Sequence, residues 1–192
     1  MRDRGNLLRL FLEINILEGI RFYSGFACIW AMHYSQGVME RTGKVLQLIC
    51  RDENLHLSLT QYLLNTLKKK EDEGFIEEYA KLQPDIKYIY QTACEQEFEW
   101  IDYLFSKGDF LGMSGMVAKE YIKYLCDKRL RAIGETAIYG VTDNPISWVR
   151  NYTHYDLMEQ KPQESEIINY LTNVVDFNIT DDTIAKLKGK LV

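Results

Sequence analysis

The sequence contains only three prolines in 192 residues, and no segment alternates apolar and polar residues as a half-buried β-strand does. Apolar residues instead recur at intervals of three and four over long stretches, which is the period of an α-helix. This spacing and the scarcity of helix breakers argue against a sheet-based architecture. We therefore expect an all-α fold.

Long apolar runs are also missing from the sequence. The longest one, residues 22–32, is only about half of the roughly 20 residues that a transmembrane helix needs. The first residues show no cationic stretch followed by a short apolar run and a small-residue cleavage site. We expect a cytoplasmic protein with no membrane partner.

Cysteines are few, and no two of them are close in the sequence. Cys28, Cys50, Cys94 and Cys126 form no Cys-x-x-Cys pair, and no histidine stands at zinc-finger spacing from them. We expect buried, reduced thiols rather than disulfides or a structural zinc site.

Positive charge is not concentrated anywhere along the chain. The net charge is −5, and the basic residues are scattered apart from Lys68, Lys69 and Lys70. A protein that binds a phosphate backbone needs a basic patch or stripe. We expect no nucleic-acid partner.

The apolar periodicity divides the chain into four long helices and a tail. Gln36-Gly37 is predicted to end the first helix, because glycine tolerates the left-handed conformation of a helix cap. Pro84 is predicted to break or restart the third helix. The expected helices cover residues 6–34, 38–69, 75–105 and 116–132. We expect residues 1–140 to form the helical part, and residues 141–192 to form a short helix near residues 148–152 and a flexible tail.

A carboxylate stands on the apolar side of the first predicted helix. Positions i, i+4, i+7 and i+11 of that helix form one stripe, which consists of Phe11, Asn15, Glu18 and Phe22. Burying an unpaired carboxylate costs several kcal/mol, so Glu18 needs a cation beside it. That cation is a metal ion or an arginine, and the simpler partner is Arg21 on a solvated face.

The second predicted helix carries Glu53 and His56 three residues apart. Side chains at i and i+3 lie about 5–6 Å apart on one face, so a carboxylate oxygen and an imidazole nitrogen can bind one ion. In ferritin-like di-iron proteins, two helices each contribute a Glu-x-x-His element and two others each contribute a Glu. For an isolated Glu-x-x-His, a surface salt bridge is the alternative.

The order of these residues favours a metal site. A helix with one core glutamate is followed by an antiparallel helix with Glu-x-x-His, which is half of the ferritin-like ligand set. Oxygen and imidazole ligands suit iron or manganese. The sequence is already within an amphipathic helix at Leu7, so we expect the first helices of the bundle and the three remaining ligands to come from elsewhere.

Two longer segments surround the candidate ligands. Residues 15–23 read NILEGIRFY and residues 49–57 read ICRDENLHL. They are similar to the NALEAIRFY and IARDExLHL segments of the class I ribonucleotide reductase small subunit. Further segments recur in the order found in that family, at residues 100–105, 144–148, 162–164 and 170–171. The resemblance runs from Leu7 to Tyr170, and it implies the carboxyl-terminal half of a ferritin-like di-iron bundle.

The resemblance implies roles for individual residues. The iron ligands of a site that activates oxygen and generates a tyrosyl radical would include Glu18, Glu53 and His56, with manganese as the alternative metal. Asp52 would hydrogen-bond a ligand histidine on the radical-transfer route, and its alternative role is to pair with Arg51. Tyr170, in the tail, would relay the radical to the large subunit, which is an expected partner.

The resemblance also extends to the surroundings of the radical, and it indicates which parts of the family's site the chain lacks. Phe22, Phe26 and Ile49 match the apolar wall around the radical, although ordinary core packing explains them equally well. The remaining ligands and the radical tyrosine belong to the other half of the family's chain, and none of the 13 tyrosines here stands at the radical position. The basic residues near the end of the tail, within 184–192, differ from the acidic or aromatic end expected for docking. We expect a partial ribonucleoside-diphosphate reductase small subunit that is inactive without the amino-terminal half.

Two other interpretations stay open. In a non-catalytic helical interaction protein, Glu18, Glu53 and His56 would be a buried polar network that holds a homodimer together. Two copies of the chain could instead pool two glutamates and two Glu-x-x-His pairs, which is the complete ferritin-like set. The iron content measured against the oligomeric state separates these interpretations.

Overall fold

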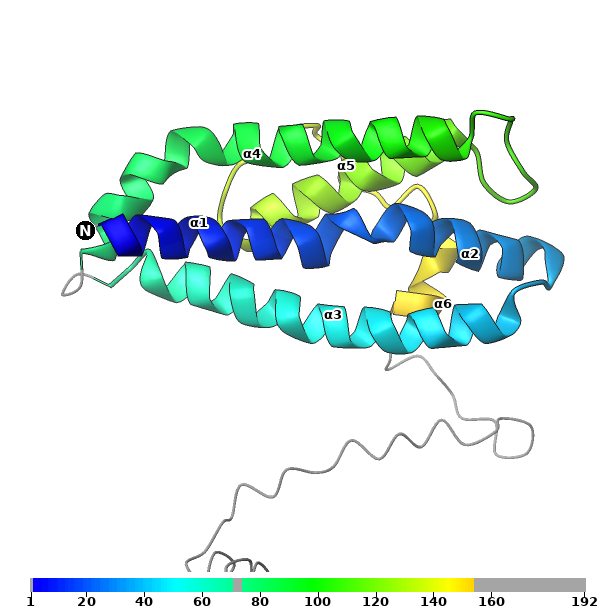
Figure 1. The fold of residues 1–192 in the computed structure, drawn as a ribbon, viewed down its shortest axis with the longest axis horizontal. Coiled ribbons are helices and arrows are strands. Elements are labelled where there is room, and N and C mark those ends of the chain that lie inside the picture. The colour runs from blue at the N-terminus through cyan, green and yellow to red at the C-terminus, as the bar shows by residue number, and fades with distance from the viewer. Residues whose placement is uncertain (1, 71–73, 154–192) are drawn as a thin grey trace, which may run out of the picture. The chain divides into compact units, whose positions relative to one another are not determined.

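The computed structural model describes residues 2–70 and 74–153. Figure 1 shows long helices that run back and forth side by side. The long elements are α1 (Arg2–Ile16), the π-helix η1 (Leu17–Arg21), α2 (Tyr23–Gln36), α3 (Glu40–Leu67), α4 (Phe75–Leu104) and α5 (Gly115–Ala132). The 3-10 helix η3 (Ser147–Val149) and the short helix α6 (Arg150–Thr153) follow. The predicted all-α fold is confirmed over this part of the chain.

Helices α1, η1 and α2 form one long rod that lies between α3 and α4 (Figure 1). Helix α1 packs against both α3 and α4, and α5 packs against α4 and α2. Successive long segments run in opposite directions, as short connections require. This arrangement brings η1, in the middle of the rod, into contact with both α3 and α5.

One helix end has the predicted capping residue, Gly37, and another has a serine cap that the sequence analysis did not predict. Helix α2 ends at Gln36, and Gly37 follows in the left-handed conformation with a φ of 67°. The backbone N–H of Gly37 donates a 2.9 Å hydrogen bond to the carbonyl of His33, which closes the last turn. At the start of α5, the side chain of Ser114 accepts a 3.2 Å hydrogen bond from the N–H of Val117.

The predicted break at Pro84 is wrong. Helix α4 continues through Pro84, and Figure 1 shows its first turns inclined to the rest of the helix. Proline removes one N–H donor and crowds the preceding turn, which bends a helix. The helix stays continuous because residues on both sides of the proline, such as Tyr79 and Ile86, are buried in the core.

The core between the helices is rich in aromatic residues. The largest fully buried side chains include Trp30, Tyr23, Tyr90 and Tyr121. All four cysteines are buried and free, as the sequence predicted. None of the described helices is both long and apolar enough to span a membrane.

A buried chain of hydrogen bonds links three helices beside the candidate site. The hydroxyl of Tyr90 in α4 donates to Oδ1 of Asn15 in α1 at 2.8 Å. The amide of Asn15 donates in turn to Oγ1 of Thr60 in α3 at 3.2 Å. Buried polar groups without partners are costly, so these bonds favour one register of α1, α3 and α4.

The segment after α5 is held against the bundle by Asp127. One carboxylate oxygen of Asp127 accepts hydrogen bonds from the N–H groups of Ile138 and Tyr139 at 2.8 and 3.0 Å, and the other accepts from Val141 at 2.7 Å. The short helix predicted near residues 148–152 coincides with η3 and α6. The division at residue 140 stays a prediction, because the predicted tail lies largely outside the described residues.

Candidate metal centre

Glu18 lies in a π-turn rather than in a regular α-helix. The segment Leu17–Arg21 forms the π-helix η1 between α1 and α2. A π-turn inserts one extra residue into the helix, and such turns are frequent at functional sites. The extra residue changes which side chains share a face. Phe22, predicted to lie on the stripe with Asn15 and Glu18, is therefore 41% exposed while Asn15 is fully buried.

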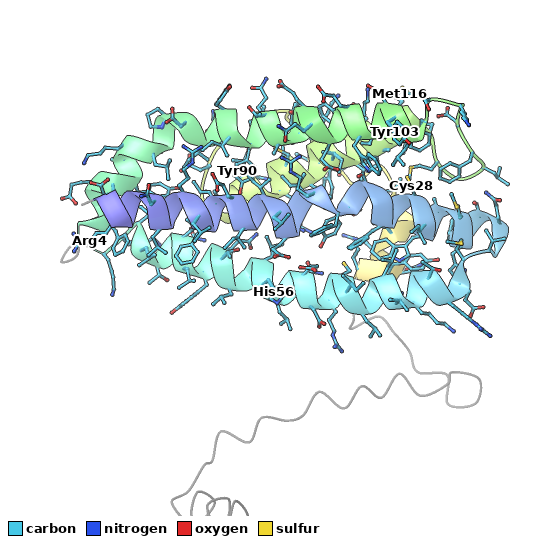
Figure 2. The ribbon with its side chains drawn as sticks, in the orientation of Figure 1. Arg4, Cys28, His56, Tyr90, Tyr103 and Met116 are labelled. Atoms are coloured by element: carbon cyan, nitrogen blue, oxygen red, sulfur yellow. The ribbon has the colours of Figure 1, made fainter. Side chains whose placement is uncertain are left out.

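Three candidate ligands converge between η1 and α3. Nδ1 of His56 lies 3.4 Å from Oε2 of Glu53 and 3.7 Å from Oε2 of Glu18. One ligand atom from each of the three residues lies within 4.8 Å of the other two. Figure 2 locates His56 midway along α3. The predicted convergence of these three side chains is therefore present in the fold.

The environment of Glu18 is suited to binding a cation. Its Oε2 is buried and accepts no hydrogen bond within the described part of the chain. The side chains of Glu18 and Glu53 are only 15% and 17% exposed, so two carboxylates share one poorly solvated space. Like charges this close repel each other unless a cation lies between them. Two carboxylate oxygens and one imidazole nitrogen form a donor set that suits iron or manganese.

The side chain of His56 is 59% exposed, unlike the two carboxylates. It lies on the outer face of α3, within a row of exposed apolar residues that we call the α3 apolar face. This face consists of Val45, Ile49, Leu55, Leu59 and Tyr62, whose exposed fractions range from 38% to 67%. The candidate site is thus open on the side where further ligands could approach.

The other predicted site residues are not brought to the cluster. Asp52 is exposed, and it lies 3.3 Å from Nε of Arg51, which is the alternative role considered for it. Its predicted hydrogen bond to a ligand histidine stays a prediction. Tyr170 lies outside the described residues. Of the predicted apolar wall, Phe26 is buried and stacks on Phe22 with ring centroids 6.1 Å apart.

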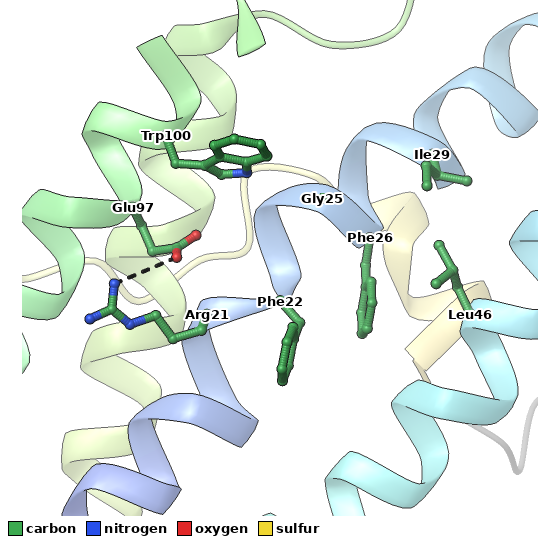
Figure 3. Close-up of a pocket in the computed structure, with 8 residues that line it drawn as sticks. All are labelled: Arg21, Phe22, Gly25, Phe26, Ile29, Leu46, Glu97 and Trp100. Atoms are coloured by element: carbon green, nitrogen blue, oxygen red, sulfur yellow. Dashed lines mark ion pairs between the residues drawn. The ribbon is translucent and has the colours of Figure 1, made fainter. Parts of the chain in front are cut away.

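An open pocket of about 440 Å³ lies between α2, α3 and α4 (Figure 3). Its lining consists of Arg21, Phe22, Gly25, Phe26, Ile29, Leu46, Glu97 and Trp100. Glu97 is a buried carboxylate that lies 3.9 Å from Arg21 and accepts a 2.8 Å hydrogen bond from Ser24. Burial raises the pKa of Glu97 above its ordinary value.

Sequence analysis missed Glu97, although a signal was present. Tyr90, Cys94, Glu97 and Ile101 recur at i, i+4, i+7 and i+11 of α4, and all four are buried. A carboxylate on such a stripe calls for a partner, by the same argument that identified Glu18. The partners, Ser24 and Arg21, are more than 70 residues away in sequence, so only the fold identifies them.

Comparison with known proteins gives one consistent family. The model of the family "Ribonucleotide reductase, small chain" matches residues 2–145. The ribonucleoside-diphosphate reductase subunit beta of Buchnera aphidicola (Schizaphis graminum) is 36% identical over 184 residues, which is 94% of this chain and 49% of that protein. The protein of the same name from Enterobacteria phage T4 is 32% identical over 193 residues, which is 97% of this chain and 49% of that protein.

Solved structures agree with the sequence comparison. The ribonucleotide reductase R2 subunit from Clostridium botulinum matches with a TM-score of 0.69 and 33% identity, over 77% of this chain and 45% of that chain. A putative class I ribonucleotide reductase from Bacillus halodurans matches with a TM-score of 0.68 and 28% identity, over 78% and 52% of the two chains. The predicted ferritin-like bundle is confirmed by these matches.

The chain spans about half the length of the curated relatives it matches. The family match covers the helices from α1 to α5, including the π-turn with Glu18 and the helix with Glu53 and His56. The chain therefore belongs to the ribonucleotide reductase small-chain family.

Proposed function

We propose that the chain is the carboxyl-terminal half of a class I ribonucleotide reductase small subunit and contributes Glu18, Glu53 and His56 to a di-iron site. The observation that carries this proposal is the buried Oε2 of Glu18, which accepts no hydrogen bond within the described residues and faces a second carboxylate and an imidazole. When bound, iron would supply the oxygen activation that precedes tyrosyl radical formation. Manganese suits the same donors.

The chain's own residues bind and orient the metal in this proposal. Glu18 and Glu53 supply negative charge from a poorly solvated space. A carboxylate attracts a cation more strongly there than it does in water. His56 supplies a neutral nitrogen from the open side. Phe22 and Phe26, whose rings stack on each other, are proposed to form part of the apolar surroundings of the site. Asp52 and Tyr170 are proposed to connect the site to a large subunit, which binds the ribonucleotide.

The proposed site is incomplete in one copy of the chain. A ferritin-like di-iron site uses two Glu and two Glu-x-x-His elements, and the described residues supply one of each. The relatives are about twice as long, which leaves room for the other elements in the part that this chain does not match. A separate polypeptide with that part would cover the α3 apolar face. The chain alone is then expected to be inactive.

Iron content and radical yield test this proposal. The purified chain is loaded with Fe²⁺ and exposed to oxygen, alone and after mixing with the unmatched part of a full-length relative. We expect a tyrosyl radical signal in electron paramagnetic resonance only from the mixture. A strong radical from the chain alone, or no iron bound by the mixture, contradicts the proposal.

A symmetric homodimer is the second candidate. Two copies would bring together two Glu18 residues and two Glu53-x-x-His56 pairs, and the exposed His56 lies on a face that is apolar enough to pack against another copy. In that case two irons per dimer would bind without any other polypeptide. Light scattering combined with iron analysis separates this outcome from the heteromeric site.

A further inference from the structure

Arg129 in α5 is a buried cation beside the π-turn. Only 7% of the residue is exposed, and no carboxylate of the described residues forms an ion pair with it. Its Nε donates a 3.3 Å hydrogen bond to the carbonyl of Gly19, and its guanidinium lies 5.7 Å from the ring centroid of Tyr23. A buried charge without a counter-ion is costly, so these contacts determine where the guanidinium lies.

The carbonyl that Arg129 binds belongs to the π-turn itself. Gly19 directly follows Glu18 within Leu17–Arg21. A π-turn interrupts the regular i→i+4 ladder of the helix, and a side chain that donates to one of its carbonyls stabilises the interruption. The bond from Arg129 therefore acts on the backbone one residue away from a candidate ligand.

Packing at Gly19 restricts the same backbone from two sides. A Cβ atom added to Gly19 would lie 3.0 Å from Nε of Arg129 and 3.1 Å from Cδ1 of Leu57. Leu57 is buried and directly follows His56 in α3. The π-turn is thus enclosed between α5 and the segment of α3 that carries the other two candidate ligands. Small displacements of Arg129 would move Glu18 relative to His56.

We propose that Arg129 is a positioning residue for Glu18, which holds the π-turn by its carbonyl and thereby sets the geometry of the metal site. The proposal rests on the proposed function, because it takes Glu18 to be a metal ligand. It links α5, which contributes no candidate ligand, to the affinity of the site. Loss of a group that hydrogen-bonds a metal ligand directly commonly lowers metal affinity about 10- to 100-fold. Arg129 acts one residue away from the ligand, so we expect an effect at the lower end of that range.

Two variants of the full chain separate the bond from the charge. Arg129→Met keeps the length of the side chain and removes its donors and its charge, whereas Arg129→Lys keeps the charge and one donor. Gly19→Ala tests the packing, and Gly25→Ala is its matched control because a Cβ at Gly25 would meet nothing within 4 Å. Each variant is measured for amide hydrogen exchange without metal, for Mn²⁺ affinity, and for thermal unfolding.

In the wild-type chain we expect Mn²⁺ to bind and to slow exchange at residues 17–22. In Arg129→Met we expect faster exchange at residues 17–22 but not in α4, and Mn²⁺ affinity lowered about tenfold. Arg129→Lys is expected to restore part of the affinity, and Gly19→Ala is expected to lower the affinity more than Gly25→Ala does.

Three results would overturn the proposal. Unchanged exchange and affinity in Arg129→Met would show that the bond does not position Glu18. Faster amide hydrogen exchange throughout the bundle in Arg129→Met would show that Arg129 stabilises the core as a whole and does not position Glu18. Faster local exchange in Arg129→Met would leave Arg129 without a metal site to support if the wild-type chain binds no Mn²⁺, either alone or mixed with the unmatched part of a full-length relative. Absence of binding in that mixture would also count against the proposed function itself.

Discussion

Oγ of Ser24 donates a 2.8 Å hydrogen bond to Oε2 of Glu97, which joins α2 to α4 through a buried carboxylate. Burial raises the pKa of Glu97, while the Ser24 hydrogen bond and the charge of Arg21 act in the opposite direction. Between its unfolded and folded pKa values, Glu97 therefore retains in the folded chain a proton that the unfolded chain has released. The stability contributed by neutral Glu97 is present below its unfolded pKa, and it is lost as the pH rises through its folded pKa.

Glu97→Gln should remove this pH dependence. We expect the free energy of unfolding of the variant to increase relative to that of the wild type as the pH rises towards neutrality. The increase should begin at about pH 4, near the ordinary pKa of glutamate. Urea unfolding at several pH values measures the difference. The control is Glu99→Gln, on the exposed side of the same helix. For this variant, the difference in unfolding free energy from the wild type should not change with pH. A constant difference for Glu97→Gln would mean that folding does not raise the pKa of Glu97.

Glu18→Gln should stabilise the metal-free chain while it abolishes metal binding. The substitution removes one of two neighbouring, partly buried carboxylates, and the new amide can donate to Glu53. We expect Tm to rise by about 2–4 °C for each kcal/mol gained in a chain of this size. Calorimetry with and without Mn²⁺ measures both effects. A lower Tm in the metal-free variant would argue that Glu18 has a structural partner.

The matched control for Glu18→Gln is Glu13→Gln. Glu13 lies on α1, where it pairs with Arg9 on the surface with a distance of 2.9 Å. Exposed i,i+4 pairs contribute only about 0.3–0.5 kcal/mol. The control should therefore leave both Tm and Mn²⁺ affinity nearly unchanged.

The sequence predicted the helices and the three candidate ligands because both depend on local spacing. The capping glycine Gly37 and the Glu53–His56 pair are determined by neighbours within one turn. The π-turn at Glu18 could not be predicted in the same way, because the segment continues an apolar helical pattern and the side chain that bonds the turn is far away in sequence. Its stabilisation comes from Arg129, 110 residues along the chain.

Pro84 and the buried ionisable residues also show that local sequence does not determine every feature of the fold. Pro84 disfavours a helix locally, yet burial of the side chains around it keeps α4 continuous. Arg129 and Glu97 are ionisable residues on apolar stripes, and their identity alone does not reveal the carbonyl or the hydroxyl that accommodates them. Long-range partners of this kind decide the geometry of the candidate site.

Asp127→Ala should destabilise the chain strongly. The carboxylate accepts hydrogen bonds from three backbone N–H groups, and it is fully buried. Leaving these donors without an acceptor costs about 3 kcal/mol. Urea unfolding measures the loss, and Asp143→Ala, in the exposed part of the same segment, should change little. If Asp127→Ala costs less than its control, the segment after α5 is not held by this carboxylate.

The α3 apolar face should be needed for assembly and not for folding. Leu55 and Leu59 are 64% and 57% exposed, so replacing both with glutamine removes little buried surface from the chain. In an assembly that covers α3, burial of each leucine would contribute about 1.5–3 kcal/mol. We therefore expect the double variant to unfold like the wild type, and to bind the unmatched part of a full-length relative at least about tenfold more weakly.

Leu111 and Met116 provide the control for this double variant. They are 71% and 74% exposed and lie outside α3, in the loop before α5 and in α5 itself, so the pair Leu111→Gln and Met116→Gln should leave binding unchanged. Sedimentation of the chain with and without the added polypeptide measures the affinity. Equal weakening by both double variants would indicate non-specific hydrophobic association. A loss of self-association alone, with binding of the added polypeptide intact, would assign the α3 apolar face to the homodimer.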